Sequence, residues 1–158
     1  MKEKSKSQKG KPVRVSRDMA LMLTSGIFSL RSTCHLGNGA VLAKEGRIIA
    51  CGFNGAPSGQ SHCSELGCIL DEKGHCQRSI HAEVNSVAMA ARYGISTEGS
   101  TLYCTTAPCP SCSKLLINSG ITRVVYGKTY SDMSGVELLK ACGVEVTHFD
   151  SKELISGN

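Results

Sequence analysis

Three metal-binding side chains and one carboxylate, placed at two predicted helix starts, constrain this chain more than any other feature. His81 opens an alanine-rich helical stretch, and Glu83 follows two residues later. Cys109 and Cys112 flank Pro110, which suits the first turn of a second helix. Cysteines three apart on a helical turn face the same way, and a helix start favours the thiolate. The fold must therefore bring two helix starts together.

This set of ligands is typical of a catalytic zinc site. Structural zinc sites are closed by four protein ligands, whereas catalytic sites use three and leave one position for water. Zinc lowers the pKa of that water toward neutrality, and Glu83 is then free to move protons. An H-x-E pattern followed by P-C-x-x-C is the signature of zinc-dependent nucleobase deaminases.

Each motif has a simpler interpretation when it is taken alone. A histidine followed by a glutamate near a helix start is usually surface decoration, and a lone C-x-x-C more often marks a structural zinc half-site or a redox pair. The redox interpretation leaves His81 and Glu83 without a role. The two motifs together, each opening a helix, favour catalysis.

The positive charge of the chain is concentrated at its N-terminus. Residues 1–17 hold seven basic side chains and one acidic one, a net charge of +6, whereas the whole chain of 158 residues carries +5. The net charge of residues 18–158 is thus close to zero, which argues against nucleic acid as a partner of the folded domain. We expect a flexible basic tail over residues 1–15 and one catalytic domain over residues 16–158.

The cysteine content indicates a reducing compartment. Nine cysteines without a secretory signal are expected to serve metals rather than disulfides. No apolar stretch approaches the roughly 20 residues that span a bilayer, so no membrane association is expected. The predicted location is the cytoplasm, or the host cytoplasm for a viral product.

The spacing of apolar residues predicts alternating helices and strands. Ser16 can cap a helix that runs to about Arg31, and a hairpin over 39–44 and 47–53 follows. Further helices are expected over 81–93, 110–120 and 133–142, and further strands over 101–105, 123–126 and 144–149. This alternation predicts an α/β fold with a largely parallel sheet between helices.

Residues 54–80 form a long connection with little hydrophobic periodicity. A structureless segment of this length is unusual in a compact domain unless something orders it. Four ligands from this region would close a structural zinc site. The preferred ligands are Cys63, Cys68, His75 and Cys76, with Cys34 as the leading substitute. A set of reduced, partly buried thiols is the alternative.

Several segments together carry a family resemblance. They are Gly52-Phe53-Asn54-Gly55, His62-Cys63, Gly67-Cys68, His75-Cys76, Ile80-His81-Ala82-Glu83-Val84-Asn85 and Ala107-Pro108-Cys109-Pro110-Ser111-Cys112. Over about residues 16–150 the chain resembles the deoxycytidylate (dCMP) deaminases of the zinc-dependent cytidine deaminase superfamily. The resemblance implies a three-layer α/β/α fold with a five-stranded mixed sheet between helices. It also implies hydrolysis of dCMP to dUMP and ammonia, which supplies thymidylate synthesis.

The resemblance also implies roles for particular residues. His81, Cys109 and Cys112 would hold the zinc, and Glu83 would carry protons to N3 and then to the amino group of cytosine. The substrate would contact Asn54, Ala82 and Tyr130, with Asn54 on the sugar 3′-hydroxyl. The segment Gly52, Phe53, Asn54 and Gly55, with Phe53 in place of the family's tyrosine, is implicated in binding the effectors dCTP and dTTP with Mg²⁺. A homo-oligomer, often a hexamer, is implied as well.

The sequence leaves other functions open. The substrate of a zinc deaminase could be another cytosine nucleoside or nucleotide, or tRNA adenosine, although a nearly neutral body argues against RNA. A structural zinc module with a nucleic-acid-binding tail would need neither Glu83 nor an open zinc position. Candidates for the 5′-phosphate site are Lys128, Arg78 and Arg92, each of which is more often a solvated surface residue.

Overall fold

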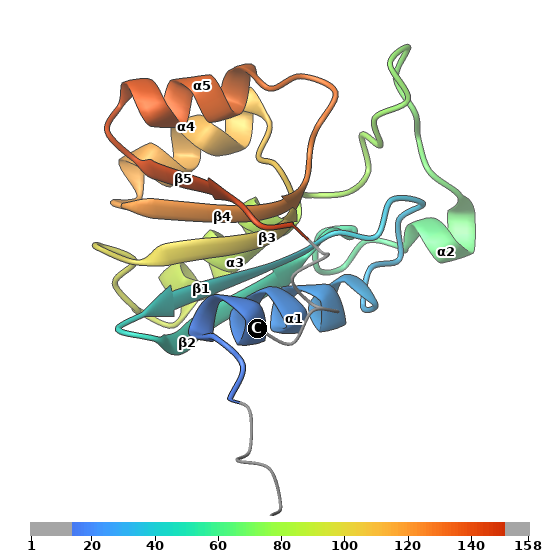
Figure 1. Ribbon diagram of the computed structural model, residues 1–158. Coiled ribbons are helices and arrows are strands. Elements are labelled where there is room, and N and C mark those ends of the chain that lie inside the picture. The colour runs from blue at the N-terminus through green and yellow to red at the C-terminus, as the bar shows by residue number, and fades with distance from the viewer. Residues whose placement is uncertain (1–13, 151–158) are drawn as a thin grey trace, which may run out of the picture.

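The computed structural model describes residues 14–150 and shows one sheet with helices on both faces (Figure 1). The five strands are β1 Gly39–Lys44, β2 Arg47–Phe53, β3 Thr101–Thr106, β4 Arg123–Lys128 and β5 Glu145–His148, in the spatial order β2-β1-β3-β4-β5. β1 is antiparallel to both of its neighbours, whereas β3, β4 and β5 are parallel. This confirms the predicted α/β fold with a mixed sheet.

Five helices accompany the sheet in the described residues. They are α1 Arg17–Ser29, α2 Cys63–Leu66, α3 Ala82–Arg92, α4 Pro110–Asn118 and α5 Ser134–Ala141. The Ser16 hydroxyl accepts a hydrogen bond from the Met19 N–H and caps α1, as predicted. Helix α2 was not predicted. Within the described part, no helix has the length and apolar character needed to cross a membrane.

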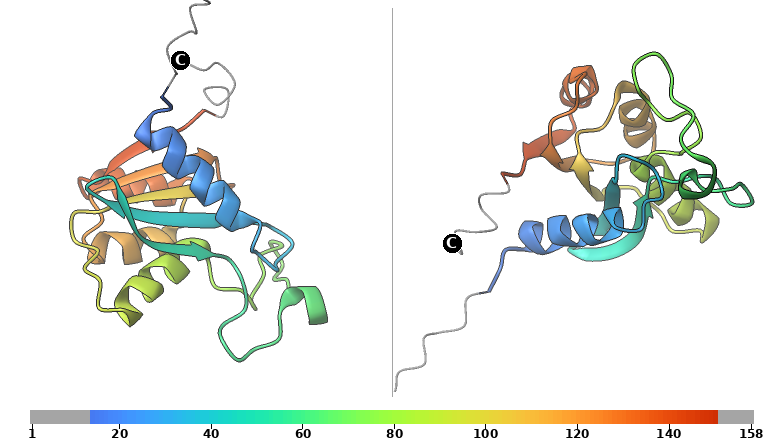
Figure 2. Two further views of the ribbon diagram at one scale, coloured as in Figure 1. Left: turned by 90° about the horizontal axis from the view of Figure 1, so that it is seen from below. Right: turned by 90° about the vertical axis from the view of Figure 1, so that its right-hand side faces the viewer.

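The helices form two layers, one on each side of the sheet (Figure 2). Of the helices in residues 14–150, α1 is the one that packs on one face, where its Met19 and Met22 meet Val41 and Val125. Helices α3, α4 and α5 cover the other face through a second apolar cluster that includes Leu42, Leu102, Val124, Leu116 and Leu139. Neighbouring residues of β1 and β4, such as Val41 and Leu42 or Val124 and Val125, thus face opposite layers, as the two-residue period of a strand requires.

A close approach of backbones places the start of α3 against β2. A side chain at Gly52 would put its Cβ 2.3 Å from the Ala82 carbonyl oxygen, so only glycine fits there. The Asn85 side-chain amide also donates a hydrogen bond to the Phe53 carbonyl oxygen at 2.9 Å. The first turn of α3 is therefore held at the end of β2.

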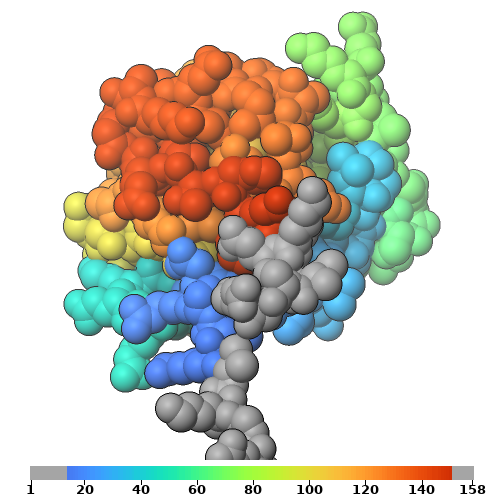
Figure 3. Space-filling view, in the orientation of Figure 1, coloured from blue at the N-terminus to red at the C-terminus, as the bar shows by residue number. Residues whose placement is uncertain are grey.

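The connection between β2 and α3 runs beside the sheet (Figures 1 and 3). Its ends meet in an isolated bridge between Gly55 and Ile80, and a second bridge joins Leu70 and Cys76. In the described residues, α2 is the only helix of this connection. Of the predicted basic tail, residues 1–13 lie outside the described part of the chain.

Candidate active site

The three predicted zinc ligands meet where two helices begin. His81 is the N-cap residue of α3, and Cys109 is the N-cap residue of α4, with Cys112 in the first turn of the latter helix. His81 Nδ1 lies 3.6 Å from Cys109 Sγ and 3.3 Å from Cys112 Sγ. Bond lengths to a tetrahedral zinc would place such donor atoms about 3.5–3.8 Å apart. The donor set therefore fits zinc.

The protonation of the two cysteines also suits a metal. Hydrogen bonds from Cys112 and then from His81 lower the pKa of the Cys109 thiol to about 4, although burial opposes them. The pKa of Cys112 is raised in turn, mainly by the hydrogen bond with Cys109 and then by burial. The pKa of His81 is raised chiefly by its hydrogen bond with Cys109. The lowered pKa of Cys109 favours its thiolate, which is the form of cysteine that binds zinc.

Glu83 is a buried carboxylate beside this cluster. It lies in the first turn of α3 and is only 7% exposed. Burial raises its pKa to about 7, against the opposing effects of its own backbone N–H and of His81. A carboxyl group whose pKa is close to neutrality can both accept and release a proton at physiological pH.

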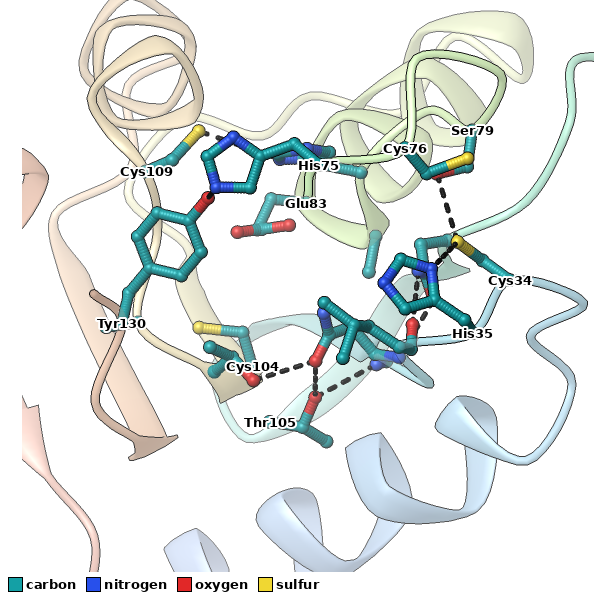
Figure 4. Close-up of a pocket in the computed structure, with 18 residues that line it drawn as sticks. Cys34, His35, His75, Cys76, Ser79, Glu83, Cys104, Thr105, Cys109 and Tyr130 are labelled. Carbon is teal, nitrogen blue, oxygen red and sulfur yellow. Dashed lines mark hydrogen bonds between the residues drawn. The ribbon is translucent and has the colours of Figure 1, made fainter. Parts of the chain in front are cut away.

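A cavity of about 60 Å³ is lined by Glu83 (Figure 4). Its labelled walls carry Tyr130 and His75 on one side and His35 on the other, with Thr105 at the floor. A larger cavity of about 690 Å³ adjoins it and shares His81, Cys109, His75 and Tyr130 in its lining. The small cavity has the size for the edge of a ring, and the large one has room for the rest of a ligand.

The structure brings together the three residues predicted to contact substrate. Asn54, Ala82 and Tyr130 all line the cavity that contains Glu83. The Tyr130 hydroxyl lies 2.9 Å from His75 Nε2, and the two rings are stacked with their centroids 5.8 Å apart. Asn54 is 5% exposed, and its Oδ1 accepts a hydrogen bond from the Asn38 N–H at 2.8 Å. Its Nδ2 donates to the Leu36 carbonyl oxygen, and within residues 14–150 its second hydrogen has no acceptor.

The predicted effector segment does not form one continuous surface. Gly52 is packed against α3, and Gly55 is bridged to Ile80. The Phe53 ring lies under the Arg31 guanidinium, 5.9 Å from its centre, and Asn54 faces the cavity instead. The candidates for the phosphate site line neither of the two cavities: Lys128, Arg78 and Arg92.

Sequence reasoning overlooked several polar residues of the cavity, among them Asn38 and Thr105. Asn38 precedes β1 and Thr105 lies near the end of β3, and both line the cavity. Polar side chains next to strand ends were the available signal, since these positions commonly face a site in an α/β sheet.

A second cluster consists of Cys34, Cys63, Cys68 and Cys76, whose sulfur atoms all lie within 4.8 Å of one another. The four come from the segment after α1, from α2 and from the connection to α3. The prediction of His75 as a ligand is not supported, because its imidazole faces Tyr130 instead. Cys76 is paired with Leu70 in extended backbone, so its neighbour His75 points the opposite way. Cys34, the leading substitute, takes the fourth place.

This cysteine cluster also has the character of a metal site. Burial raises the pKa of Cys63 to about 12. Burial acts on Cys76 in the same direction, but the N–H groups of Ser79 and Arg78 outweigh it and lower the pKa of Cys76 to about 6. Four sulfur ligands leave no open position, which is the arrangement of structural zinc.

Comparison with known proteins agrees with this geometry. The chain is 37% identical over 144 residues to ComE operon protein 2 of Bacillus subtilis, covering 90% of this chain and 76% of that protein. It is 32% identical over 160 residues to the deoxycytidylate deaminase of Enterobacteria phage T4, covering 77% of this chain and 83% of that protein.

A solved structure and a protein family complete the comparison. The dCMP deaminase of cyanophage S-TIM5, crystallised with dCMP and dUMP, superposes with a TM-score of 0.76 at 35% identity, covering 86% of this chain and 100% of that one. Residues 21–128 match the family described as "Cytidine and deoxycytidylate deaminase zinc-binding region". The chain therefore belongs to the zinc-binding cytidine and deoxycytidylate deaminase family.

Proposed function

We propose that this protein hydrolyses dCMP to dUMP and ammonia. The observation that carries the proposal is the buried Glu83 carboxyl, whose pKa is about 7, inside a cavity shared with His81 and Cys109. Relatives and a solved structure named as dCMP deaminases at 32–35% identity support the choice of substrate. A zinc ion held by His81, Cys109 and Cys112 would supply a water that ionises near neutral pH.

Glu83 carries the protons of this reaction. The carboxylate accepts a proton from the attacking water and delivers it to N3 of cytosine as the water oxygen bonds to C4. The carboxylate then accepts the proton of the new hydroxyl group on C4 and passes it to the amino nitrogen. The bond from C4 to that nitrogen breaks as the C4 carbonyl forms, and ammonia leaves. A pKa near 7 suits both directions of transfer, because neither form of the group is strongly preferred.

The remaining cavity residues hold the nucleotide. In this proposal the unused N–H of Asn54 donates to the sugar 3′-hydroxyl. The small side chain of Ala82 and the ring of Tyr130 enclose the base next to Glu83. The larger adjoining cavity accommodates the phosphate end of the nucleotide, because the smaller one is too small for a whole nucleotide.

A second zinc in the cluster of Cys34, Cys63, Cys68 and Cys76 is part of the proposal. It would tie the connection over residues 54–80 to the segment after α1 and so order the wall of the cavity that bears His35. Metal analysis of unchelated protein is expected to find two zinc ions per chain, and one zinc per chain would contradict this part of the proposal.

Regulation and assembly follow the family resemblance. Activation by dCTP and inhibition by dTTP, both with Mg²⁺, are proposed for the segment that contains Phe53 and Asn54. Initial rates with and without each effector test this proposal. A homo-oligomer, a hexamer in the first instance, is tested by light scattering.

The substrate assignment is tested by ultraviolet spectroscopy with parallel measurement of ammonia. We expect the purified protein with zinc to act on dCMP and to act much less on deoxycytidine and dCTP, which lack the phosphate or carry two more phosphates. Release of ammonia from deoxycytidine but not from dCMP would reassign the substrate. No release from any cytosine nucleoside or nucleotide would refute the proposed function.

A further inference from the structure

Asn38 shares the floor of the cavity with Asn54. It precedes β1 and lines the cavity together with Glu83 and Thr105. Two hydrogen bonds join the two asparagines: the Asn54 N–H donates to the Asn38 carbonyl at 3.1 Å, and the Asn38 N–H donates to Asn54 Oδ1 at 2.8 Å. The Asn54 carboxamide is therefore held against the backbone of Asn38.

Two threonine hydroxyls orient the Asn38 side chain. Thr105 Oγ1 accepts a hydrogen bond from the Gly39 N–H at 3.1 Å, so its own hydrogen needs another acceptor. Asn38 Oδ1 lies 3.2 Å from Thr105 Oγ1 and 2.7 Å from Thr106 Oγ1. Oδ1 thus accepts hydrogen bonds from both hydroxyl groups. These bonds fix which end of the carboxamide is the oxygen and which is the NH₂ group.

The amide nitrogen of Asn38 is an unused donor in the cavity. Within residues 14–150 no acceptor pairs with Asn38 Nδ2. This nitrogen is not fully buried, and Asn38 lines the cavity. The free N–H is therefore accessible to a ligand there. An oriented N–H donor beside a substrate is expected to form a hydrogen bond with an acceptor oxygen of that substrate.

We propose that Asn38 determines the sugar specificity of this protein by donating a hydrogen bond to the 2′-hydroxyl of a ribonucleotide, so that CMP is deaminated as well as dCMP. The inference rests on the proposed function, in which Asn54 holds the sugar 3′-hydroxyl. The 2′ and 3′ carbons are adjacent in the sugar ring, so the donor next to Asn54 faces the 2′ position. With dCMP, which lacks this hydroxyl, a water molecule takes the hydrogen bond instead.

The experiment compares kcat/KM for CMP and dCMP in the wild-type protein and in Asn38→Leu. Leucine keeps the branched shape of asparagine but has no donor. One hydrogen bond is worth about 1–1.5 kcal/mol, which corresponds to about a tenfold effect. We expect the wild-type ratio of CMP to dCMP to lie within about tenfold of one, and Asn38→Leu to lower that ratio by about tenfold. Rejection of CMP by the wild-type protein, or an unchanged ratio in Asn38→Leu, would overturn the inference.

Two further variants separate this role from a structural one. Thr106→Val keeps the N–H donor but removes one hydroxyl that orients it, so the ratio is expected to fall by about two- to threefold. This variant also carries the test if Asn38→Leu does not fold. Asn118→Leu, on the exposed end of α4, is the matched control and should leave the ratio unchanged. An equal loss with CMP and dCMP in both cavity variants would indicate a structural role only and would also overturn the inference.

Binding of the two products gives a readout that does not depend on turnover. UMP and dUMP differ only at the 2′ position, and calorimetry yields both dissociation constants. Asn38→Leu is expected to weaken UMP by about tenfold relative to dUMP, and equal weakening contradicts the role of Asn38. If neither cytosine nucleotide is deaminated, the proposed function fails, and this binding comparison still decides on Asn38.

Discussion

The two metal-ligand clusters of this chain are built on different kinds of backbone. His81, Cys109 and Cys112 lie at the starts of α3 and α4, whereas three of the four clustered cysteines lie on irregular segments or on the short helix α2. Helix spacing predicts which side chains share a face, so the first set could be identified from the sequence. No such period governs a loop, and the second set was only partly identified.

The clusters also differ in what holds them in place. Ala82 and Leu116 anchor α3 and α4 in the main apolar cluster, so His81, Cys109 and Cys112 are brought together without a metal. The segment that carries the cysteine cluster instead exposes Leu66, Ile69 and Leu70, with Leu66 65% exposed. With so little apolar burial, this segment is expected to depend for its order on the zinc ion proposed for the four cysteines. Loss of metal from His81, Cys109 and Cys112 should therefore abolish activity. Loss of metal from the four cysteines should instead reduce the stability of the fold.

The largest expected effect is on turnover in Glu83→Gln. Glutamine keeps the size of the side chain but cannot transfer a proton, so kcat should fall by about 10³-fold or more. Zinc content should not change, because Glu83 lies beside the ligands and is not one of them. Glu137→Gln, in the first turn of α5, is the control. Near wild-type release of ammonia by Glu83→Gln would contradict its role.

Cys112→Ser tests the catalytic cluster. Serine is a weak zinc ligand, so we expect one zinc ion fewer per chain and loss of activity. The melting temperature should change by only about 3 °C, because the apolar core and not the metal holds α3 and α4. Metal analysis and calorimetry on one preparation measure both effects. A large fall in melting temperature would remove the distinction between the clusters.

Cys76→Ser tests the cysteine cluster. We expect one zinc ion fewer per chain again, but with a loss of unfolding free energy of about 3 kcal/mol, since loss of a structural metal is among the large single-site effects. Limited proteolysis should then cut within residues 54–80. If Cys76→Ser is as stable and as protease-resistant as the wild-type protein, the segment does not depend on a metal.

The smallest expected effect lies away from both clusters and serves as a reference. Arg123 donates hydrogen bonds to the Asp18 carboxylate at 3.0 and 2.8 Å and holds the pKa of Asp18 below its usual value. The stabilisation is therefore complete above the unfolded pKa of about 3.9 and is lost as the pH falls through the lower folded pKa.

Asp18→Asn should remove this part of the acid dependence. The carboxylate is partly exposed, so we expect about 1 kcal/mol or less at neutral pH. Urea denaturation of both proteins at pH 6 and pH 3 measures the difference. An equal loss of stability on acidification in both proteins would show that the pair does not contribute to the acid dependence.

Much of the fold follows from local pattern. The hairpin over 39–44 and 47–53 has the predicted bounds, and the other strands agree to within about two residues. Helix α2 was missed because four residues are too few to show a helical period. The choice of His75 as a ligand has a different origin. His75 and Cys76 are both metal-ligand residue types, and only the backbone conformation shows that their side chains point in opposite directions.

The sequence alone predicted the cluster of His81, Cys109 and Cys112 and the neighbouring Glu83, because their spacing within helix starts decides which way they point. Cys34 joins the second cluster, and Asn38 meets Asn54 and Thr105, only in the folded chain. These contacts join segments that are remote in sequence, and no local period relates their directions. Packing of α1 and α3 on opposite faces of the sheet sets where each segment emerges, and so the tertiary structure decided which side chains form the floor and walls of the cavity.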